Sequence, residues 1–197
     1  MQLDPGSLPQ RVQAALDARE RRGATDADGV RAAVLVLFVF RGDEPYIVFT
    51  KKTETVPHHK GQFAFPGGIV ETFDASRVET ALREAREEIG LDPEAVEILG
   101  LFDDTPTNTS GFVITPVVGV YQGVPSFRAD GREIERVVEI PLRTLLDPAC
   151  YHEEWWERDG ARHRVAFFTC GEDVVWGVTG RILRNLLDAL FPEARHG

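Results

Sequence analysis

Residues 83–91 read Arg-Glu-Ala-Arg-Glu-Glu-Ile-Gly-Leu, and this stretch says most about the fold. Successive residues of an α-helix turn by about 100°, so Glu84, Glu87 and Glu88 would share one arc of a helix. Like charges at this spacing destabilise an exposed helix by roughly 0.2–0.5 kcal/mol per pair, and a divalent cation bound between them would reverse that effect. Carboxylate oxygens suit Mg²⁺ or Mn²⁺, and no cysteine or well-spaced histidine accompanies them to suggest zinc. The stretch is therefore either a solvated charged face or one side of a divalent metal site.

The flanking residues predict a helix from Ser76 to Gly90. Ser76 followed by Glu79 matches a capping box, and Gly90 is a typical C-terminal stop. One face of this helix would be apolar, formed by Val78, Leu82, Ala85 and Ile89. Arg83 stands four residues before Glu87 and four after Glu79, so it could hold one of these carboxylates in position.

Two consecutive glycines, Gly67 and Gly68, follow Phe65 and Pro66 shortly before this helix. Glycine lets the backbone approach a ligand closely or adopt a positive φ angle. A Gly-Gly pair is also a common turn. Its position just before the carboxylate helix favours a ligand site over a simple turn.

The composition limits the possible functions. The 197 residues include 22 Lys and Arg against 32 Asp and Glu, a formal charge of −10, so no concentrated basic surface for nucleic acid is expected. The longest apolar run, Val30 to Phe40 interrupted by Arg31, is shorter than the roughly 20 residues of a membrane helix and predicts a buried strand. Residues 1–5 lack the features of a signal peptide, so we expect a cytoplasmic protein without nucleic-acid or membrane partners.

Lysines are few and lie together. Only three of the 22 basic residues are lysines, and Lys51, Lys52 and Lys60 fall within ten positions. The cluster is either a chance result of an arginine-rich composition or an anion-binding segment.

The remaining segments predict one mixed α+β domain over residues 30–197, preceded by a helical extension over residues 1–29. Helices are expected from Ser7 to about Arg22 and from Thr179 to Phe191. The expected strands are Val30–Arg41, Tyr46–Lys52, Val96–Phe102, Val113–Tyr121, Ile134–Ile140, Arg164–Thr169 and Asp173–Trp176.

Two pairs of residues outside these patterns carry separate expectations. Cys150 and Cys170 could form at most one disulfide, and we interpret both as small buried hydrophobic residues. Trp155 and Trp156 are adjacent, so on a strand one would face inward and the other outward. The outward one would cover part of a ligand, or pack in the core or an interface.

Gly68, five residues, Asp74, eight residues and then residues 83–91 closely resemble the conserved box of the Nudix hydrolases. The family pattern is glycine, five residues, glutamate, seven residues, then Arg-Glu-apolar-x-Glu-Glu-x-Gly-apolar. Nine consecutive positions fit this pattern. Asp74 replaces the first glutamate and the second spacer is one residue longer, so the departures concern Asp74 and leave the metal-binding half intact.

Residues 48–68 resemble the additional motif of the coenzyme A diphosphatases within that family. Thr50, Gly61 and residues 65–68 match, whereas Lys52 stands in place of one motif arginine and Pro57 in place of another. Lysine lacks the bidentate fork of arginine, and proline removes the contact entirely, although the lysine cluster could compensate. Similar segments follow at residues 110–119, 133–142 and 175–183, so the resemblance covers roughly residues 30 to 190.

The resemblance implies a Nudix fold, which is a mixed β-sheet between helices, and hydrolysis of CoA to 3′,5′-ADP and 4′-phosphopantetheine. It implies Mg²⁺ or Mn²⁺ held by Glu84, Glu87, Glu88 and the carbonyl of Gly68. Glu87 or the more distant Glu133 would accept the proton of the attacking water, and Arg83 would position a carboxylate. The expected substrate-binding residues are Lys51, Lys52, His59, Lys60, Gly61, Phe65 and Gly67, with His58 beside them.

Two alternatives stay open at this point. One is a Nudix hydrolase for another nucleoside diphosphate derivative, such as NADH or ADP-ribose, which the Pro57 departure favours. The other is a Nudix-fold binding module without turnover, which the intact set of glutamates argues against. We expect a small-molecule substrate and a monomer or homodimer.

Overall fold

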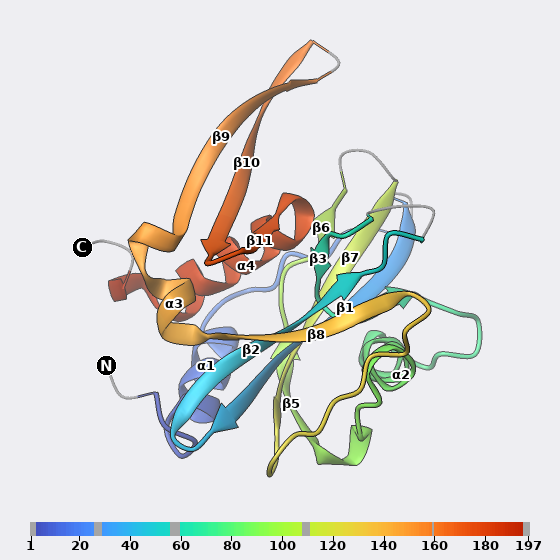
Figure 1. Cartoon of the computed structure of the whole chain (residues 1–197), viewed down its shortest axis with the longest axis vertical. Helices are drawn as coiled ribbons and strands as arrows, with labels where there is room; N and C mark the ends of the chain where they lie inside the picture. The colour runs from blue at the N-terminus through green and yellow to red at the C-terminus, as the bar shows by residue number, and fades with distance from the viewer. Residues whose placement is uncertain (1–2, 26–28, 56–59, 108–110, 159, 195–197) are drawn as a thin grey trace.

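The computed structural model describes residues 3–25, 29–55, 60–107, 111–158 and 160–194. The helices are α1 (Leu8–Asp17), α2 (Arg77–Ile89), α3 (Leu142–Leu146) and α4 (Gly177–Leu190), with 3₁₀ turns at Pro93–Ala95, Pro148–Cys150 and Pro192–Ala194 (Figure 1). The strands are β1 (Val30–Arg41), β2 (Glu44–Lys52), β3 (Phe63–Ala64), β4 (Gly67–Ile69), β5 (Val96–Leu101), β6 (Thr105–Pro106), β7 (Phe112–Tyr121), β8 (Ile134–Pro141), β9 (Tyr151–Arg158), β10 (Ala161–Cys170) and β11 (Asp173–Trp176).

The main sheet is mixed and is built around β1. Its strands follow the order β3-β2-β1-β7-β5, with β4 also pairing with β1, β6 with β7, and β8 with β2. β1 and β7 run parallel, and the other paired strands run antiparallel. The predicted α+β class with a mixed sheet is therefore confirmed. The pairing of β4 with β1 places the two consecutive glycines against the central strand.

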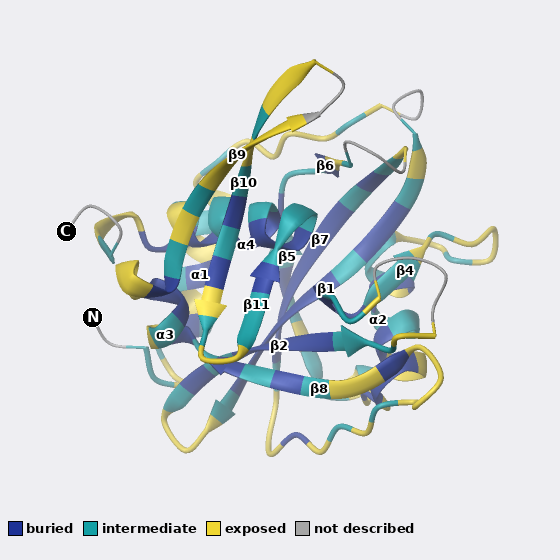
Figure 2. Ribbon diagram, turned by 45° about the horizontal axis from the view of Figure 1, so that its top comes forward, coloured by how far each residue is buried: buried dark blue, intermediate teal, exposed yellow. Residues whose placement is uncertain are grey.

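Alternate side chains of β1 enter different halves of the core, which explains why its sequence is apolar throughout. Leu35 and Leu37 pack with Ala85 and Ile89 of α2. Phe38 lies on the other side of the sheet, in the cluster that contains the apolar residues of α1 and α4. The side chains of Leu35, Leu37, Phe38, Ala85 and Ile89 are all buried, and Figure 2 colours most of β1 as buried. The sheet thus lies between α2 on one face and α1 with α4 on the other, as predicted.

The N-terminal helix is shorter than predicted and is capped differently. It ends at Asp17, and the side chain of Ser7 makes no capping hydrogen bond; Asp4 Oδ1 instead accepts from the Ser7 N–H at 3.0 Å. The chain leaves the helix because the following arginines pair with acidic side chains beyond β5, as in the 2.5 Å contact of Arg19 with Asp103. The apolar side of α1 enters the main core through Leu8, Val12 and Leu16.

A long hairpin formed by β9 and β10 projects from the body of the protein (Figure 1), and β11 completes a three-stranded antiparallel sheet at its base. The expectation that only one of the adjacent tryptophans faces outward is wrong. Trp155 is 57% exposed, and Trp156, whose ring lies 5.4 Å from that of Trp176 between the centroids, is 43% exposed. The guanidinium groups of Arg162 and Arg164 lie over the Trp155 ring, 5.1 and 5.3 Å from its centroid.

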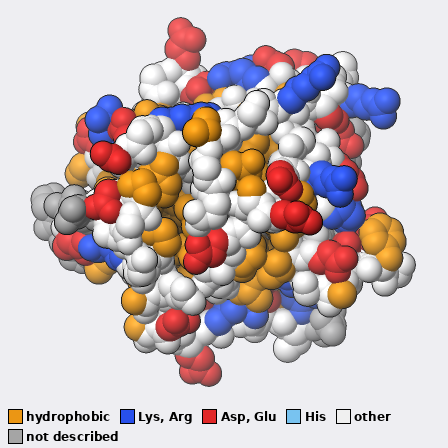
Figure 3. Space-filling view, turned by 90° about the horizontal axis from the view of Figure 1, so that it is seen from below, with side chains coloured by type: hydrophobic (Ala, Val, Ile, Leu, Met, Phe, Trp, Pro, Cys, Tyr) orange, Lys and Arg blue, Asp and Glu red, His pale blue; other side chains and the backbone are white. Residues whose placement is uncertain are grey.

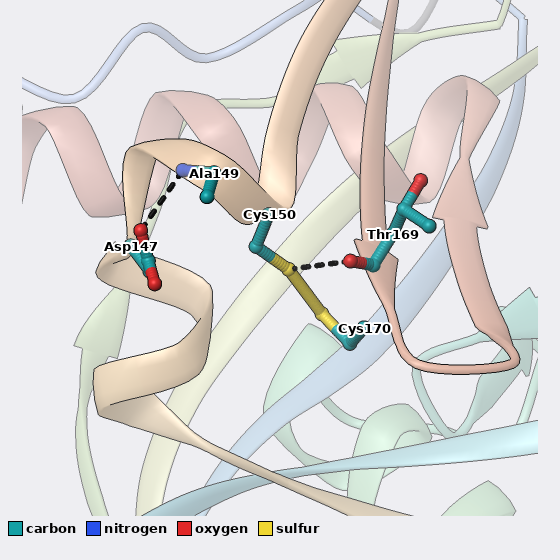
Figure 4. The surroundings of a disulfide bond; sticks show 5 residues. All are labelled: Asp147, Ala149, Cys150, Thr169 and Cys170. Atoms are coloured by element: carbon teal, nitrogen blue, oxygen red, sulfur yellow. Dashed lines mark hydrogen bonds between the residues drawn. A yellow bond between two sulfur atoms is a disulfide. The ribbon is translucent and has the colours of Figure 1, made fainter.

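A disulfide joins Cys150 to Cys170, so their interpretation simply as small buried hydrophobic residues is wrong (Figure 4). Cys150 is 5% exposed, which agrees with its expected burial. The hairpin register pairs Tyr151 with Phe168, and this brings the two cysteines within 5.8 Å between Cα atoms, a separation suited to a disulfide. The pairing depends on a register across 20 residues, which local sequence patterns do not reveal. The bond closes the base of the projecting hairpin.

Two features of the described residues concern possible partners. None of the helices in these ranges is long and apolar enough to cross a membrane. On the face seen in Figure 3, acidic and apolar side chains lie across the middle, and most of the coloured basic side chains lie toward the margins. The side chains drawn in colour on this face therefore form no continuous basic surface of the kind that binds a phosphate backbone.

Candidate active site

The carboxylate helix α2 begins as its sequence predicts. Ser76 Oγ accepts from the N–H of Glu79 at 3.1 Å, and the Glu79 carboxylate accepts from the N–H of Ala75 at 2.6 Å. At the other end, Gly90 takes a left-handed conformation with a φ of 67°. These two caps fix where the helix starts and stops, and therefore which side chains face the sheet.

Asp74, whose role the sequence leaves unclear, anchors Arg83. The guanidinium donates from Nε to Asp74 Oδ1 and from Nη2 to Oδ2, both at 3.0 Å, and the Asp74 side chain is 1% exposed. Asp74 also accepts from the N–H of Glu71 and the hydroxyl of Thr80, both at 2.9 Å. The hydrogen bonds from Arg83 hold the pKa of Asp74 well below its usual range. Thr80 is a contributor that the sequence gives no reason to single out.

Arg83, held by Asp74, also contacts two of the helix glutamates. Its Nη1 donates to Glu84 Oε1 at 2.8 Å and lies 3.6 Å from Glu87 Oε2. The predicted reach toward Glu87 is therefore confirmed, whereas Glu79 serves as a helix cap and makes no ion pair with Arg83. One arginine, fixed by Asp74, thus positions two of the three carboxylates.

Glu88 is the most unusual of the three. It is 6% exposed, and its Oε2 accepts from the N–H of Gly67 at 3.1 Å. Burial raises its pKa to about 8, against the favourable charge of Lys52 and the hydrogen bond from Gly67. Negative charge on Glu84 and Glu133 adds to the rise. The cost of burying this carboxylate therefore exceeds what Lys52 and the Gly67 N–H offset.

Glu84 and Glu87 complete the arc. Burial also raises the pKa of Glu84, Arg83 opposes that rise, and the charges of Glu87 and Glu133 add to it. A Cβ on Gly68 would lie 2.5–2.7 Å from the carboxylate atoms of Glu84, so a larger residue there would displace that carboxylate. The side chain of Glu87 is 62% exposed. The second glycine of the pair therefore lets the Glu84 carboxylate lie close to the backbone.

No three His, Cys, Asp or Glu side chains within the described ranges converge as a ready-made metal centre. The orientations explain this result, because Glu84 faces Arg83, Glu87 faces solvent and Glu88 accepts from the Gly67 backbone. The donor chemistry nevertheless fits a divalent cation. The three carboxylates offer hard oxygen ligands, and burial disfavours the charged forms of Glu84 and Glu88, which a bound cation would stabilise.

Glu133 is distant in sequence, and the fold brings it to the same place. It is exposed and immediately precedes β8, and its carbonyl accepts from the N–H of Thr53 at 2.8 Å. Its charge acts on both Glu84 and Glu88. Glu133 is one of the two carboxylates expected to act as base. The fold brings it near the helix glutamates, although 45 residues separate it from Glu88 in the sequence.

The three lysines are not equivalent. Lys52 follows Lys51 on β2, so their side chains point to opposite faces of the sheet. Lys52 acts electrostatically on Glu88, whereas Lys51 pairs with Glu135 at 3.2 Å. Lys60 is exposed. Of the lysine cluster, only Lys52 has an interaction with the buried glutamate, and Pro57, His58 and His59 lie outside the described residues.

Two residues expected to bind substrate have another role. Phe65 is 3% exposed and stacks on Phe49 with the ring centroids 5.0 Å apart, so it belongs to the core and is no surface contact. Gly67 has a φ of 153°, and a Cβ there would lie 2.4 Å from the carbonyl oxygen of Ala33. Its backbone N–H donates a hydrogen bond to the Glu88 carboxylate. Gly61, with a φ of 62°, forms a turn against Glu54.

Comparison with known proteins agrees with this geometry. The NUDIX domain family model matches residues 29–160. A Cronobacter sakazakii protein named "Uncharacterized Nudix hydrolase NudL" is 40% identical over 156 residues, which span 79% of this chain and 81% of that protein. The protein of the same name from Photorhabdus laumondii is 34% identical over 81% of this chain and 85% of its own length.

Among solved structures, a MutT/nudix family protein from Enterococcus faecalis matches with a TM-score of 0.55. The match covers 96% of this chain and 71% of that one, and its 18% identity bears on the fold alone. The family model covers well over half of the chain and the relatives span most of it. The chain therefore belongs to the Nudix hydrolase family.

Proposed function

We propose that this Nudix hydrolase cleaves the diphosphate bond of coenzyme A and its derivatives with the help of Mg²⁺ or Mn²⁺, releasing 3′,5′-ADP and 4′-phosphopantetheine. Nudix hydrolases act on nucleoside diphosphate derivatives and generally use divalent metal ions. One observation carries the finer proposal. The segment that resembles the CoA diphosphatase motif runs into Gly67 and Gly68, whose backbones contact Glu88 and Glu84. The residues expected to select the substrate and those expected to hold the metal thus belong to one continuous segment.

Glu84, Glu87 and Glu88, with the carbonyl of Gly68, would hold the metal. A bound Mg²⁺ or Mn²⁺ supplies the positive charge that polarises the diphosphate and lowers the pKa of a bound water. The acidic site needs this charge for a further reason, because a diphosphate would otherwise meet three glutamates directly. The same cation would remove the electrostatic cost that the raised pKa of Glu88 reflects.

The chain's own residues supply positioning and proton transfer. Arg83, fixed by Asp74, keeps Glu84 in place, and Lys52 adds positive charge beside Glu88. In the proposed reaction a water oxygen bonds to phosphorus while the bond to the bridging oxygen breaks. The water proton passes to the carboxylate of Glu133, and the second phosphate leaves with the bridging oxygen. Glu87 is the other candidate for this proton, since it is exposed and bound only loosely by Arg83.

A substrate panel tests the proposal. The protein is incubated with Mg²⁺ or Mn²⁺ and with CoA, acyl-CoA, NADH, ADP-ribose, FAD or dNTPs, and the products are identified by mass. Release of 3′,5′-ADP from CoA at the highest kcat/KM supports the proposal. Cleavage of NADH or ADP-ribose with CoA untouched would replace it by the second candidate function, which the Pro57 departure favours. No turnover of any compound would point to a binding module.

We further propose that the reaction takes place in the cytoplasm, that the binding partner is a small molecule, and that the active species is a monomer or homodimer. Size-exclusion chromatography with light scattering, run with and without Mn²⁺, measures the oligomeric state.

A further inference from the structure

The turn that follows Asp130 is organised by a single side chain. Asp130 Oδ1 accepts from three backbone N–H groups, those of Arg132 at 3.1 Å, Glu133 at 3.2 Å and Ile134 at 2.9 Å. The N–H of Glu133 also lies 3.3 Å from Oδ2. Gly131 has a φ of 71°, and its N–H donates to the Ile134 carbonyl at 3.1 Å, which closes the turn. The backbone of Glu133 is thus held by the carboxylate of Asp130.

The same turn is fastened directly to the carboxylate helix. The N–H of Asp130 donates to the carbonyl of Glu88 at 3.0 Å, and the N–H of Arg128 donates to the carbonyl of Ile89 at 2.9 Å. These are carbonyls of the last turn of α2, which lack partners within the helix. Asp130 is therefore hydrogen-bonded to the backbone of Glu88, the residue whose carboxylate is buried.

A third connection runs to the end of β2. The N–H of Thr53 donates to the carbonyl of Glu133 at 2.8 Å, and the Thr53 hydroxyl donates to the carbonyl of Arg132 at 3.1 Å. Beside this point the register between β2 and β8 shifts between Lys51 and Lys52, which is a bulge. Bulges redirect side chains and are frequent beside active sites. Glu133 is therefore fixed between α2 on one side and the end of β2 on the other.

We propose that Asp130 is a positioning residue, which sets the distance of the Glu133 carboxylate from Glu84 and Glu88 by holding the backbone of residues 132–134 and by binding the Glu88 carbonyl. The inference rests on the proposed role of Glu133 as acceptor of the water proton. It does not depend on which nucleoside diphosphate derivative is cleaved. Asp130 itself has no role in contacting the substrate, and its effect on the reaction passes through Glu133.

Two substitutions of Asp130 separate the loss of its hydrogen bonds from the loss of its charge. Asp130→Ala removes the side-chain acceptor of the turn, whereas Asp130→Asn keeps an oxygen that can accept from all three N–H groups. Misplacement of a reacting group by about 1 Å costs on the order of a hundredfold in rate. We expect Asp130→Ala to lower kcat by about 30–100-fold with little change in KM or in the metal concentration for half-maximal activity. We expect Asp130→Asn to retain kcat within about threefold of the wild type.

A double-mutant cycle separates positioning from general stability. In a Glu133→Gln background, Asp130→Ala has nothing left to position, so its effect on kcat is expected to shrink to less than about threefold. The matched control is Asp147→Ala, because Asp147 Oδ1 also accepts a backbone N–H, that of Ala149 at 2.9 Å, but beside the disulfide (Figure 4). This control is expected to leave kcat unchanged. Circular dichroism and thermal unfolding confirm that each variant is folded.

The outcomes distinguish the proposals. An equal loss from Asp130→Ala with and without Glu133, or an equal loss in Asp130→Asn, overturns the positioning role. A wild-type kcat in Glu133→Gln overturns it as well, while cleavage of CoA by that variant leaves the proposed function standing. If CoA is not cleaved but another panel compound is, the cycle is measured with that compound. If Asp130→Ala does not fold, Asp130→Ser replaces it and is expected to lie between Ala and Asn in kcat.

Discussion

In the candidate active site a carboxylate is buried, and in the β9–β10 hairpin two tryptophans are exposed. Glu88 is 6% exposed, and Trp155 and Trp156 are 57% and 43% exposed. Both arrangements oppose the usual preference of their residue types. They differ in how they are held. Glu88 is surrounded by specific backbone contacts from Gly67 and Asp130, whereas the outer hairpin is held by strand pairing and a disulfide at its base. The comparison shows that the buried carboxylate is held by contacts specific to its position, whereas the exposed tryptophans depend on the pairing of their strand.

The largest effect is expected from Glu88→Gln, which keeps the size of the side chain and removes its charge. Substitutions in residues that only support metal ligands cost about 10–100-fold, so loss of a ligand should lower kcat/KM by at least about a hundredfold. Steady-state kinetics over a range of Mn²⁺ concentrations measures the loss. Glu154→Gln on the hairpin is the control, and equal effects of the two substitutions would remove the distinction between the regions.

Asp74→Asn tests whether the anchor of Arg83 is as important for stability as its burial suggests. Asp74→Asn removes the buried charge that faces Arg83 and leaves Glu84 as its nearest ionic partner, so the free energy of unfolding at pH 7 should fall by about 3 kcal/mol. Arg83 keeps the pKa of Asp74 below its ordinary value of 3.8. The contribution is therefore fully present above pH 3.8, declines as the pH falls below that value, and is lost only as the pH passes through the much lower folded-state pKa. Urea unfolding at pH 7 and pH 3 checks both points: the gap between variant and wild type should be smaller at pH 3 than at pH 7, and a gap that does not narrow would contradict them.

Reduction of the disulfide tests how much the closed base of the hairpin contributes to the free energy of unfolding. Closing a loop of this size in the unfolded chain stabilises the fold by about 3 kcal/mol. Treatment with dithiothreitol, or Cys150→Ser, should therefore lower the free energy of unfolding by about that amount. It should leave kcat nearly unchanged, because the bond lies at the base of the hairpin and not among the glutamates. A loss of kcat comparable to that of Glu88→Gln would show that the two regions are coupled.

The buried glutamate should also make the metal-free protein less stable in alkaline solution. Its pKa is raised in the folded state to about 8 from an ordinary value of 4.5. Its contribution is most favourable below pH 4.5 and is lost as the pH rises through about 8. In the presence of EDTA at pH 8.5, Glu88→Gln should be more stable than the wild type by on the order of 2 kcal/mol. Thermal unfolding from pH 5 to 9 measures this, and parallel curves for the two proteins would exclude it.

The smallest effect is expected from Trp155→Ala. The ring is largely exposed and interacts with Arg162 and Arg164, and such exposed contacts contribute about 0.5–1 kcal/mol each. The free energy of unfolding should fall by no more than about 1–2 kcal/mol, with kcat unchanged. A rise in KM for CoA would instead connect the hairpin to substrate binding.

Local patterns predicted the parts of the fold that local physics determines. The capping box at Ser76, the left-handed stop at Gly90 and the apolar run of β1 all lie where the sequence indicates. The nine matching positions of the carboxylate stretch were sufficient for the family. The shared arc of the glutamates follows from helix geometry alone.

The errors have a common physical origin. Strand β9, the disulfide and the turn at Asp130 depend on which distant segments meet, and a single sequence does not specify such a register. Asp130-Gly131 indicates a turn, but nothing nearby shows that the turn binds the carbonyl of Glu88. Phe65 lies within a motif and was therefore expected to meet the substrate, although its packing against Phe49 places it in the core.

The bond between Cys150 and Cys170 encloses residues 151–169 in a covalent ring. A protease that cuts the backbone anywhere within that ring produces two new chain ends but no separate pieces. The cleaved protein would migrate as one species on a gel without reductant and as two after reduction. Because α4 follows the ring and contributes to the core on the opposite side from α2, the fragment that carries it stays tethered to the rest of the protein. The exposed hairpin can thus be damaged without loss of the helix that closes the fold.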